Sequence, residues 1–150
     1  MTAVQRDEIE AGLVVRLDTE VLRAAGGSRT NATRSDAEDR AVRGTHDFLV
    51  LAVDPSAATV LAVPLFPKTA PGSSPLDQRK RAGDVDGWLA APAFYSHWQH
   101  WRIPIDAVIA ASAADPGTPG TRRRFAVSDR DALQDAANWA TRNRNAFREA

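Results

Sequence analysis

Cysteine is absent from this chain of 150 residues, and neither sign of charge is in excess. Without cysteine the chain has no disulfides, thiolate zinc sites, iron–sulfur clusters or thiol nucleophiles. The 19 basic and 19 acidic residues give a formal net charge of zero. This balance excludes a polybasic nucleic-acid arm or an acidic mimic of DNA as a property of the whole chain.

Long apolar runs are missing as well. No run approaches the ~20 residues that a membrane-spanning helix needs, and residues 1–10 are too polar for a secretory signal. We therefore expect no membrane contact and a cytoplasmic location. The GxGxxG, Walker, HExxH and GxSxG signatures are also absent, so the sequence gives no support to a nucleotide-driven enzyme or a zinc protease.

Large apolar side chains are few. Hydrophobic residues make up 43% of the chain, but 28 of them are alanine, and Val, Ile, Leu and Phe together number 31. This supply is enough for one small core, and together with the zero net charge it favours a folded domain over a disordered chain. We predict a single domain over residues 1–150.

Short apolar segments bounded by turn residues predict the first strands. The first covers 11–17. Residues 46–53 and 59–66 predict a hairpin with its turn at 54–57, where aspartate and proline favour chain reversal. Both hairpin strands are almost continuously apolar, so we expect both of their faces to be covered. Pro64 has no amide donor, which predicts a position at an edge, a bulge or the strand end.

The rest of the chain alternates between polar segments and short apolar ones. Two segments rich in small and polar residues, 19–44 and 67–87, predict long loops. The first is expected to be mobile or partly helical, because residues 18–23 could form a helical turn that Gly26 and Gly27 stop. Further strands are expected at 96–103 and 122–127, with a strand or a short helical turn at 105–109.

The chain is predicted to end in a helix over 128–149. Ser128 is a favourable N-cap, acidic residues follow in the first turn, and arginines occupy the C-terminal end. The predicted fold class is therefore mainly β with a C-terminal helix (β+α). We expect a small SH3-like β-barrel over approximately 11–127, carrying the two long loops, with the helix packed on it.

Two of the three histidines are spaced for a metal only if they lie on a helix. His97 and His100 would then share one face, and Asp106 or Asp47 could complete a site. On a strand, which the alternating pattern favours, residues three apart point to opposite faces. We accordingly expect no metal and no cofactor.

Aromatic and basic residues lie close together in the second half of the chain. Trp98 and Trp101 are suited to stacking on unpaired bases, while Arg79, Lys80 and Arg81 are suited to contacting phosphates. These residues are candidates for nucleic-acid binding. The alternative is that the tryptophans fill a core that is short of large aliphatic residues.

His46 and Asp47 open a predicted strand immediately after a long loop, with Arg43 just before them. A histidine at such a junction is suited to general acid–base catalysis near neutral pH. A plain polar pair on an edge strand explains the same pattern.

The order of these elements resembles the MazF/PemK family of toxin endoribonucleases. Gly12 to Val15 resembles the family's opening Gly-Asp-Val-Val strand, and Thr45 to Leu51 resembles its Arg-Pro-x-x-Val-Leu segment. Val63 to Leu65 resembles its Pro-Ile/Leu-Thr segment, and Gln99 to Arg102 resembles its Gln-Val-Arg segment. The resemblance implies an SH3-like barrel with a terminal helix, a homodimer, an antitoxin or other protein partner, and metal-independent cleavage of single-stranded RNA.

The resemblance also locates the expected catalytic positions. The family's catalytic arginine corresponds to His46, its following proline to Asp47, and its threonine to Phe66. Cleavage of RNA needs a base for the 2′-hydroxyl, an acid for the leaving group and cations for the phosphorane. The candidate catalytic residues are His46, Arg43, Asp47, Lys68 and Arg102.

A second hypothesis starts from the same substitutions at the family's catalytic positions. A chain that lacks the family's arginine and threonine is also consistent with a non-catalytic SH3-like interaction module of phage or mobile-element origin. Such a module would bind a protein or a nucleic acid through loop 19–44 and the aromatic residues.

Overall fold

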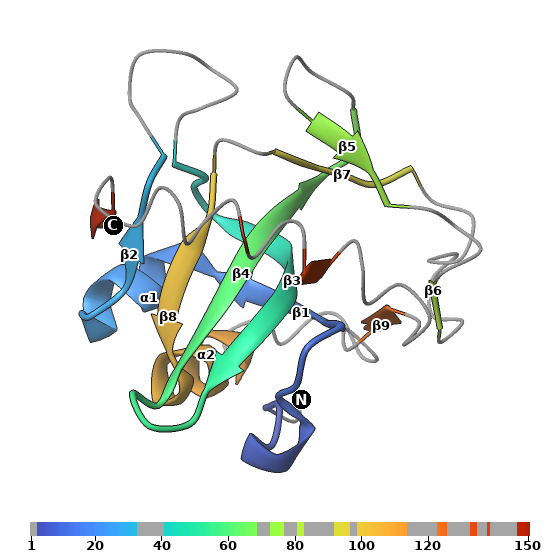
Figure 1. Ribbon diagram of the computed structural model, residues 1–150. Helices are drawn as coiled ribbons and strands as arrows, with labels where there is room; N and C mark the ends of the chain where they lie inside the picture. The colour runs from blue at the N-terminus through green and yellow to red at the C-terminus, as the bar shows by residue number, and fades with distance from the viewer. Residues whose placement is uncertain are drawn as a thin grey trace.

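A mixed-length antiparallel β-sheet dominates the computed structural model of the chain (Figure 1). The structure describes residues 3–32, 41–68, 73–76, 81–82, 92–96, 99–113, 123–125, 133–134, 138 and 147–150. In chain order the elements are η1 (Arg6–Glu8), β1 (Leu13–Asp18), α1 (Thr19–Ala25), β2 (Arg29–Thr30), β3 (Thr45–Asp54), β4 (Thr59–Phe66), β5 (Ser73–Pro75), β6 (Arg81–Ala82), β7 (Phe94–Ser96), β8 (Trp101–Pro104), α2 (Ile105–Ala113), β9 (Arg123–Phe125) and β10 (Arg148–Glu149).

The predicted hairpin is the centre of the sheet. β3 and β4 pair from Asp54 and Thr59 at the turn to Phe48 and Pro64, and β1 lies antiparallel on the other side of β3. The side chain of Asp54 accepts hydrogen bonds from the amides of the next residues and so holds the turn, as the sequence predicts. Neighbouring strands follow the order β10-β2-β8-β4-β3-β1-β9-β6, and β7 adds to the far end of β4.

Pro64 lies where β4 changes its outer partner. β8 pairs with β4 up to Ala62, and β7 pairs with it from Leu65 onward. On this side, Pro64 therefore falls in the interval between two ladders, where its missing amide leaves no ladder hydrogen bond unmade.

Both faces of the hairpin are covered, as its continuous apolar pattern predicts. Because side chains alternate along a strand, Phe48 and Val50 belong to one buried cluster, while Leu49 and Leu51 belong to another. The first cluster includes Trp101 and apolar residues of both helices. The second lies on the opposite face of the sheet.

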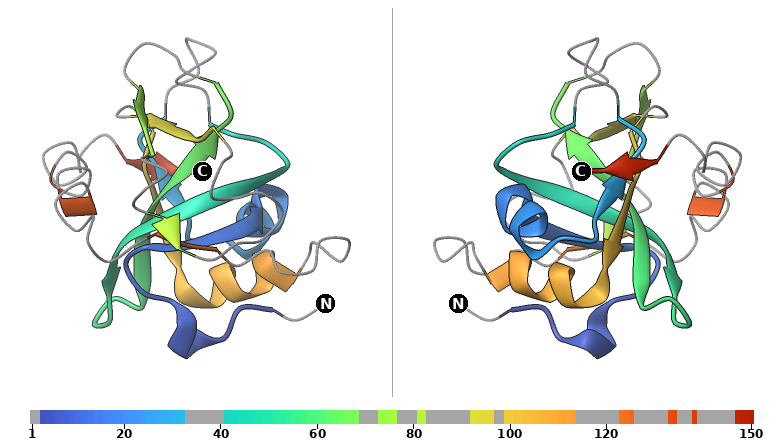
Figure 2. Two further views of the ribbon diagram at one scale, coloured as in Figure 1. Left: turned by 90° about the vertical axis from the view of Figure 1, so that its right-hand side faces the viewer. Right: turned by 90° about the vertical axis from the view of Figure 1, so that its left-hand side faces the viewer.

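Helices α1 and α2 pack on the face that carries the first cluster. Asp18 caps α1 by accepting from the amide of Glu20, and Leu22 of α1 is fully buried. The N-terminal segment then crosses α2, where the amide of Val4 donates to the Oγ of Ser112 and Arg6 pairs with Asp106. Figure 2 shows η1 lying directly beneath α2 in both views.

The prediction of a mainly β fold with helices is confirmed. Three details differ from the sequence prediction. Segment 19–44 was predicted to be a mobile or partly helical loop, with 18–23 able to form a helical turn; it contains the helix α1 and also the strand β2, which was not expected, and segment 67–87 contains β5 and β6. Among the described strands, the ends of the sheet order do not pair with each other, so the sheet is open and does not close into a barrel.

The end of the chain is also corrected. We expected a helix through residue 149, but residues 148–149 form β10, which pairs with β2. Residues 133–134 and 138 are helical, and Gln134 donates to Asn138 one turn later. The remainder of the predicted helix lies outside the described residues.

Candidate active site

His46 lies at the open end of the β3–β4 hairpin, with Arg43 three residues before it and Lys68 two residues after the end of β4. Gly44 precedes β3, and its carbonyl accepts hydrogen bonds from both the amide and the hydroxyl of Thr19, at 3.0 and 2.8 Å. These bonds fix the first residue of α1 against the start of β3. The end of β4 lies beside the start of β3 because the two strands are antiparallel.

His46 lies at this end, half-buried on the face of the first apolar cluster. Its ring is 6.0 Å from the ring of Phe66, in an edge-on arrangement. Burial lowers the pKa of His46 below its ordinary value of 6.5, although the carbonyls of Leu65 and Arg43 favour the charged form. The imidazole is therefore mainly neutral at pH 7, which is the form that accepts a proton.

Arg43 is exposed and lies beside two residues that the sequence analysis did not select. Its Nη1 is 3.4 Å from the Oε1 of Glu20, and the Nη1 of Arg23 is 3.0 Å from the same oxygen. Both residues belong to α1, in a segment predicted to be a long loop with at most a helical turn at 18–23. The three residues would have been grouped from sequence only if the Thr19–Gly44 contact had been known.

Trp101 was predicted to stack on bases, but the structure places it in the core. Its side chain is fully buried, and its indole nitrogen donates to the Oε1 of Gln99 at 2.9 Å. The same oxygen accepts from the amide of Val42 at 3.1 Å. Trp101 therefore packs the interior and supports the segment that carries Arg43, and it offers no face to a base.

Two other predicted catalytic residues do not join His46. Asp47 points to the opposite face of the sheet, where it lies across from Arg16 in the β1–β3 register. Arg102 is also on that opposite face, with its guanidinium 5.9 Å from the centre of the Phe147 ring. It pairs with Leu61, about 16 Å along β4 from the His46 end at ~3.3 Å per residue.

The remaining predictions fall on exposed or undescribed residues. Lys68 is exposed and follows β4 by two residues, close in sequence to the Phe66 ring that contacts His46. Arg81 is in β6. Arg79, Lys80 and Trp98 lie outside the described residues.

Only one member of the histidine pair is among the described residues. His100 is fully buried, its amide donates to Asn31, and its Nδ1 lies 3.5 Å from the Nδ2 of that residue. His97 lies outside the described residues. No three His, Asp or Glu side chains gather within the described ranges.

Comparisons of the chain with models of protein families, with curated proteins and with solved structures gave no significant match. No helix in the described part of the chain has the length and apolar character to cross a membrane.

Proposed function

We propose that the chain is a metal-independent endoribonuclease that acts on single-stranded RNA at the open end of the β3–β4 hairpin. The observation that carries this proposal is the position of His46, which is half-buried and mainly neutral at pH 7 at the open end of the hairpin, with Arg43 three residues before it and Lys68 two residues beyond the end of β4. A neutral imidazole beside cationic groups suits proton abstraction next to a phosphate.

In the proposed reaction, His46 accepts the proton of the 2′-hydroxyl. The 2′-oxygen attacks phosphorus, the bond to the 5′-oxygen breaks, and the departing 5′-oxygen takes its proton from water. The resulting hydroxide takes the proton held by His46, which restores the neutral imidazole. The products are a 2′,3′-cyclic phosphate and a 5′-hydroxyl. Arg43 and Lys68 stabilise the charge that develops on the phosphorane. Asp47 and Arg102 contact neither the 2′-hydroxyl nor the phosphate in this step, because both point to the other face of the sheet, and Asp47 acts on His46 only through its charge, which favours the protonated imidazole.

A non-catalytic interaction module is the second candidate, and one contact favours it. The Phe66 ring packs against the His46 imidazole, at the position where the resembled family has a threonine. A ring there supplies no hydroxyl to a substrate and covers one edge of the imidazole. A module of this kind would bind RNA or protein without cleaving it.

An RNA-cleavage assay separates the two. Purified protein is incubated with single-stranded RNA in the presence of a chelator, beside the His46→Ala variant and the Asp47→Ala variant as a matched neighbour. We expect cleavage by the unaltered chain and by Asp47→Ala, and a loss of at least about 100-fold for His46→Ala. If the unaltered chain leaves RNA intact, with or without divalent metal, the endoribonuclease proposal is rejected and the non-catalytic interaction module remains.

The resemblance further implies a homodimer and an antitoxin or other protein partner. Light scattering after size exclusion measures the first, where a mass twice that of the chain is expected and a monomer at micromolar concentration contradicts it. A partner is sought by co-purification from host lysate, followed by inhibition of the cleavage assay.

A further inference from the structure

Two arginines converge on one carboxylate oxygen beside the proposed catalytic end. The distances from Glu20 Oε1 are 3.0 Å to Arg23 and 3.4 Å to Arg43. One acidic group thus lies between two cationic groups, and these three residues together carry a net positive charge. The Arg43 and Glu20 side chains are 69% and 55% exposed, whereas that of Arg23 is only 16% exposed.

Arg23 is held rigidly in this cluster. Its Nη2 donates to the carbonyl of Val42 at 2.9 Å, and its guanidinium lies 5.5 Å from the centre of the Trp101 ring. Burial, followed by repulsion from Arg43, lowers the pKa of Arg23. A guanidinium stays protonated in proteins, so its Nη1 remains a charged and preorganised donor.

Glu20 is the movable member of the cluster. Its side chain is more than half exposed, so it can rotate into solvent without opening the core. A phosphodiester carries one negative charge over two non-bridging oxygens, which suits two guanidinium donors better than a single carboxylate oxygen does.

We propose that Arg23 and Arg43 form a binding subsite for a backbone phosphate of single-stranded RNA, which Glu20 occupies until RNA displaces it. This inference rests on the proposed function for the identity of its ligand. The hydrogen bonds from Thr19 to Gly44 place the subsite next to the start of β3. Gly44 itself lies two residues before His46.

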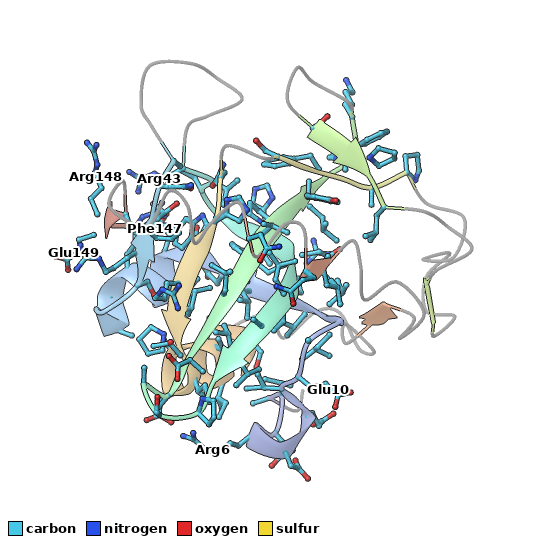
Figure 3. All side chains as sticks on the ribbon, in the orientation of Figure 1. Arg6, Glu10, Arg43, Phe147, Arg148 and Glu149 are labelled. Atoms are coloured by element: carbon cyan, nitrogen blue, oxygen red, sulfur yellow. The ribbon has the colours of Figure 1, made fainter. Side chains whose placement is uncertain are left out.

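The first test compares two substitutions that change the net charge equally. Binding is measured by fluorescence anisotropy with a labelled 2′-O-methyl RNA oligonucleotide, which lacks the 2′-hydroxyl nucleophile. Glu20→Gln should bind this probe about two- to fivefold more tightly than the unaltered chain, because it removes the competing carboxylate. Glu10→Gln, at the far end of the molecule from Arg43, should leave the affinity unchanged (Figure 3).

The second test removes a cation from each end. Arg43→Ala should weaken binding and reduce the slope of log affinity against log salt by about 0.7, the value for one phosphate contact on a single strand. Arg6→Ala, which removes an equal charge at the end of the molecule away from Arg43, should change neither quantity (Figure 3). Circular dichroism of each variant checks that it is folded.

Equal effects within either matched pair would overturn the subsite, since net charge alone would then explain binding. Inorganic phosphate should compete with the oligonucleotide for the subsite. Phosphate that binds the chain without displacing the oligonucleotide would also overturn the subsite. The proposed function fails separately. If natural RNA stays intact but the position-dependent effects on the probe persist, the subsite stands and the enzyme does not. If natural RNA is cleaved but the two variants of each matched pair change binding equally, the proposed enzyme stands and the subsite does not.

Discussion

The imidazole of His46 should link folding stability to pH. Its pKa in the folded chain lies below the ordinary value of 6.5 because burial disfavours the charged form. The unfolded chain therefore binds the proton more readily, and the contribution of His46 to stability is fully present above about pH 6.5 and is lost as the pH falls toward the folded pKa. We expect the free energy of unfolding of the unaltered chain to fall more steeply between about pH 7.5 and 5 than that of His46→Gln.

Chemical denaturation of both chains across this pH range measures the effect. The Gln variant keeps a polar side chain of similar reach but does not titrate, so the difference between the two curves isolates the imidazole. A constant difference at every pH would show that His46 has the same pKa in both states. It would also remove the argument that this group is neutral because it is buried.

Residue identity predicted the chemistry of several side chains but not their exposure. The position of His46 at a loop–strand junction was readable from its neighbours, and the structure places it there. Trp101 has the right ring for stacking on a base, yet it is fully buried. Its burial depends on α1, whose Arg23 lies over the ring, and on the hydrogen bond to Gln99; neither contact can be read from the residue type. Glu20 and Arg23 were overlooked for the same reason, because they contact Arg43 and Val42, which lie about 20 positions away in the sequence.

At the scale of elements, the hairpin turn contains a backbone conformation that glycine adopts more easily. Ala58 has φ of 54°, in the left-handed region, and its side chain is exposed. Ala58→Gly should therefore raise the free energy of unfolding by about 0.5–1 kcal/mol, because the strain lost exceeds the added entropy of the unfolded chain. Thermal unfolding measures the change.

The control for this substitution is Ala57→Gly in the same turn. No positive φ is found for Ala57, so there the added entropy acts alone and the variant should be slightly destabilised. Stabilisation of both variants would mean that the turn as a whole is too tight. Destabilisation of both would show that Ala58 is not strained.

Elements with strong local patterns were predictable, and those made by distant pairing were not. β3 and β4 have continuous apolar sequences and turn residues between them, and their limits were predicted to within one residue. β2 and β10 have two residues each, and they exist because β2 pairs with β8 and β10 pairs with β2. Segments this short show no periodicity. The arginines near residues 148–149 were therefore interpreted as the C-terminal end of a helix.

At the scale of the molecule, the two ends of the chain close opposite faces of one sheet. Val4 is buried in the first apolar cluster and Phe147 in the second. Val4→Ala should cost about 1–2 kcal/mol from lost burial, and Phe147→Ala about 3 kcal/mol. Because the sheet lies between them, the double variant should lose the sum to within about 0.5 kcal/mol.

Urea unfolding of the two single variants and the double variant tests this additivity. A loss well below the sum would mean that one end frays before the rest of the molecule unfolds. The expectation of a single domain would then need revision, because the two clusters would not unfold together.

Pro64 has a consequence for the fidelity of folding. A slip of β4 by one residue would turn its apolar set to the wrong faces. A slip toward β7 would also carry the proline out of the interval between the β8 and β7 ladders, which covers only residues 63 and 64. The displaced proline would then confront a carbonyl that needs a donor, so the misaligned sheet would lose a hydrogen bond as well as its packing. The missing amide of Pro64 thus favours the correct alignment of β4 with β8 and β7, because a sheet displaced in that direction is less stable.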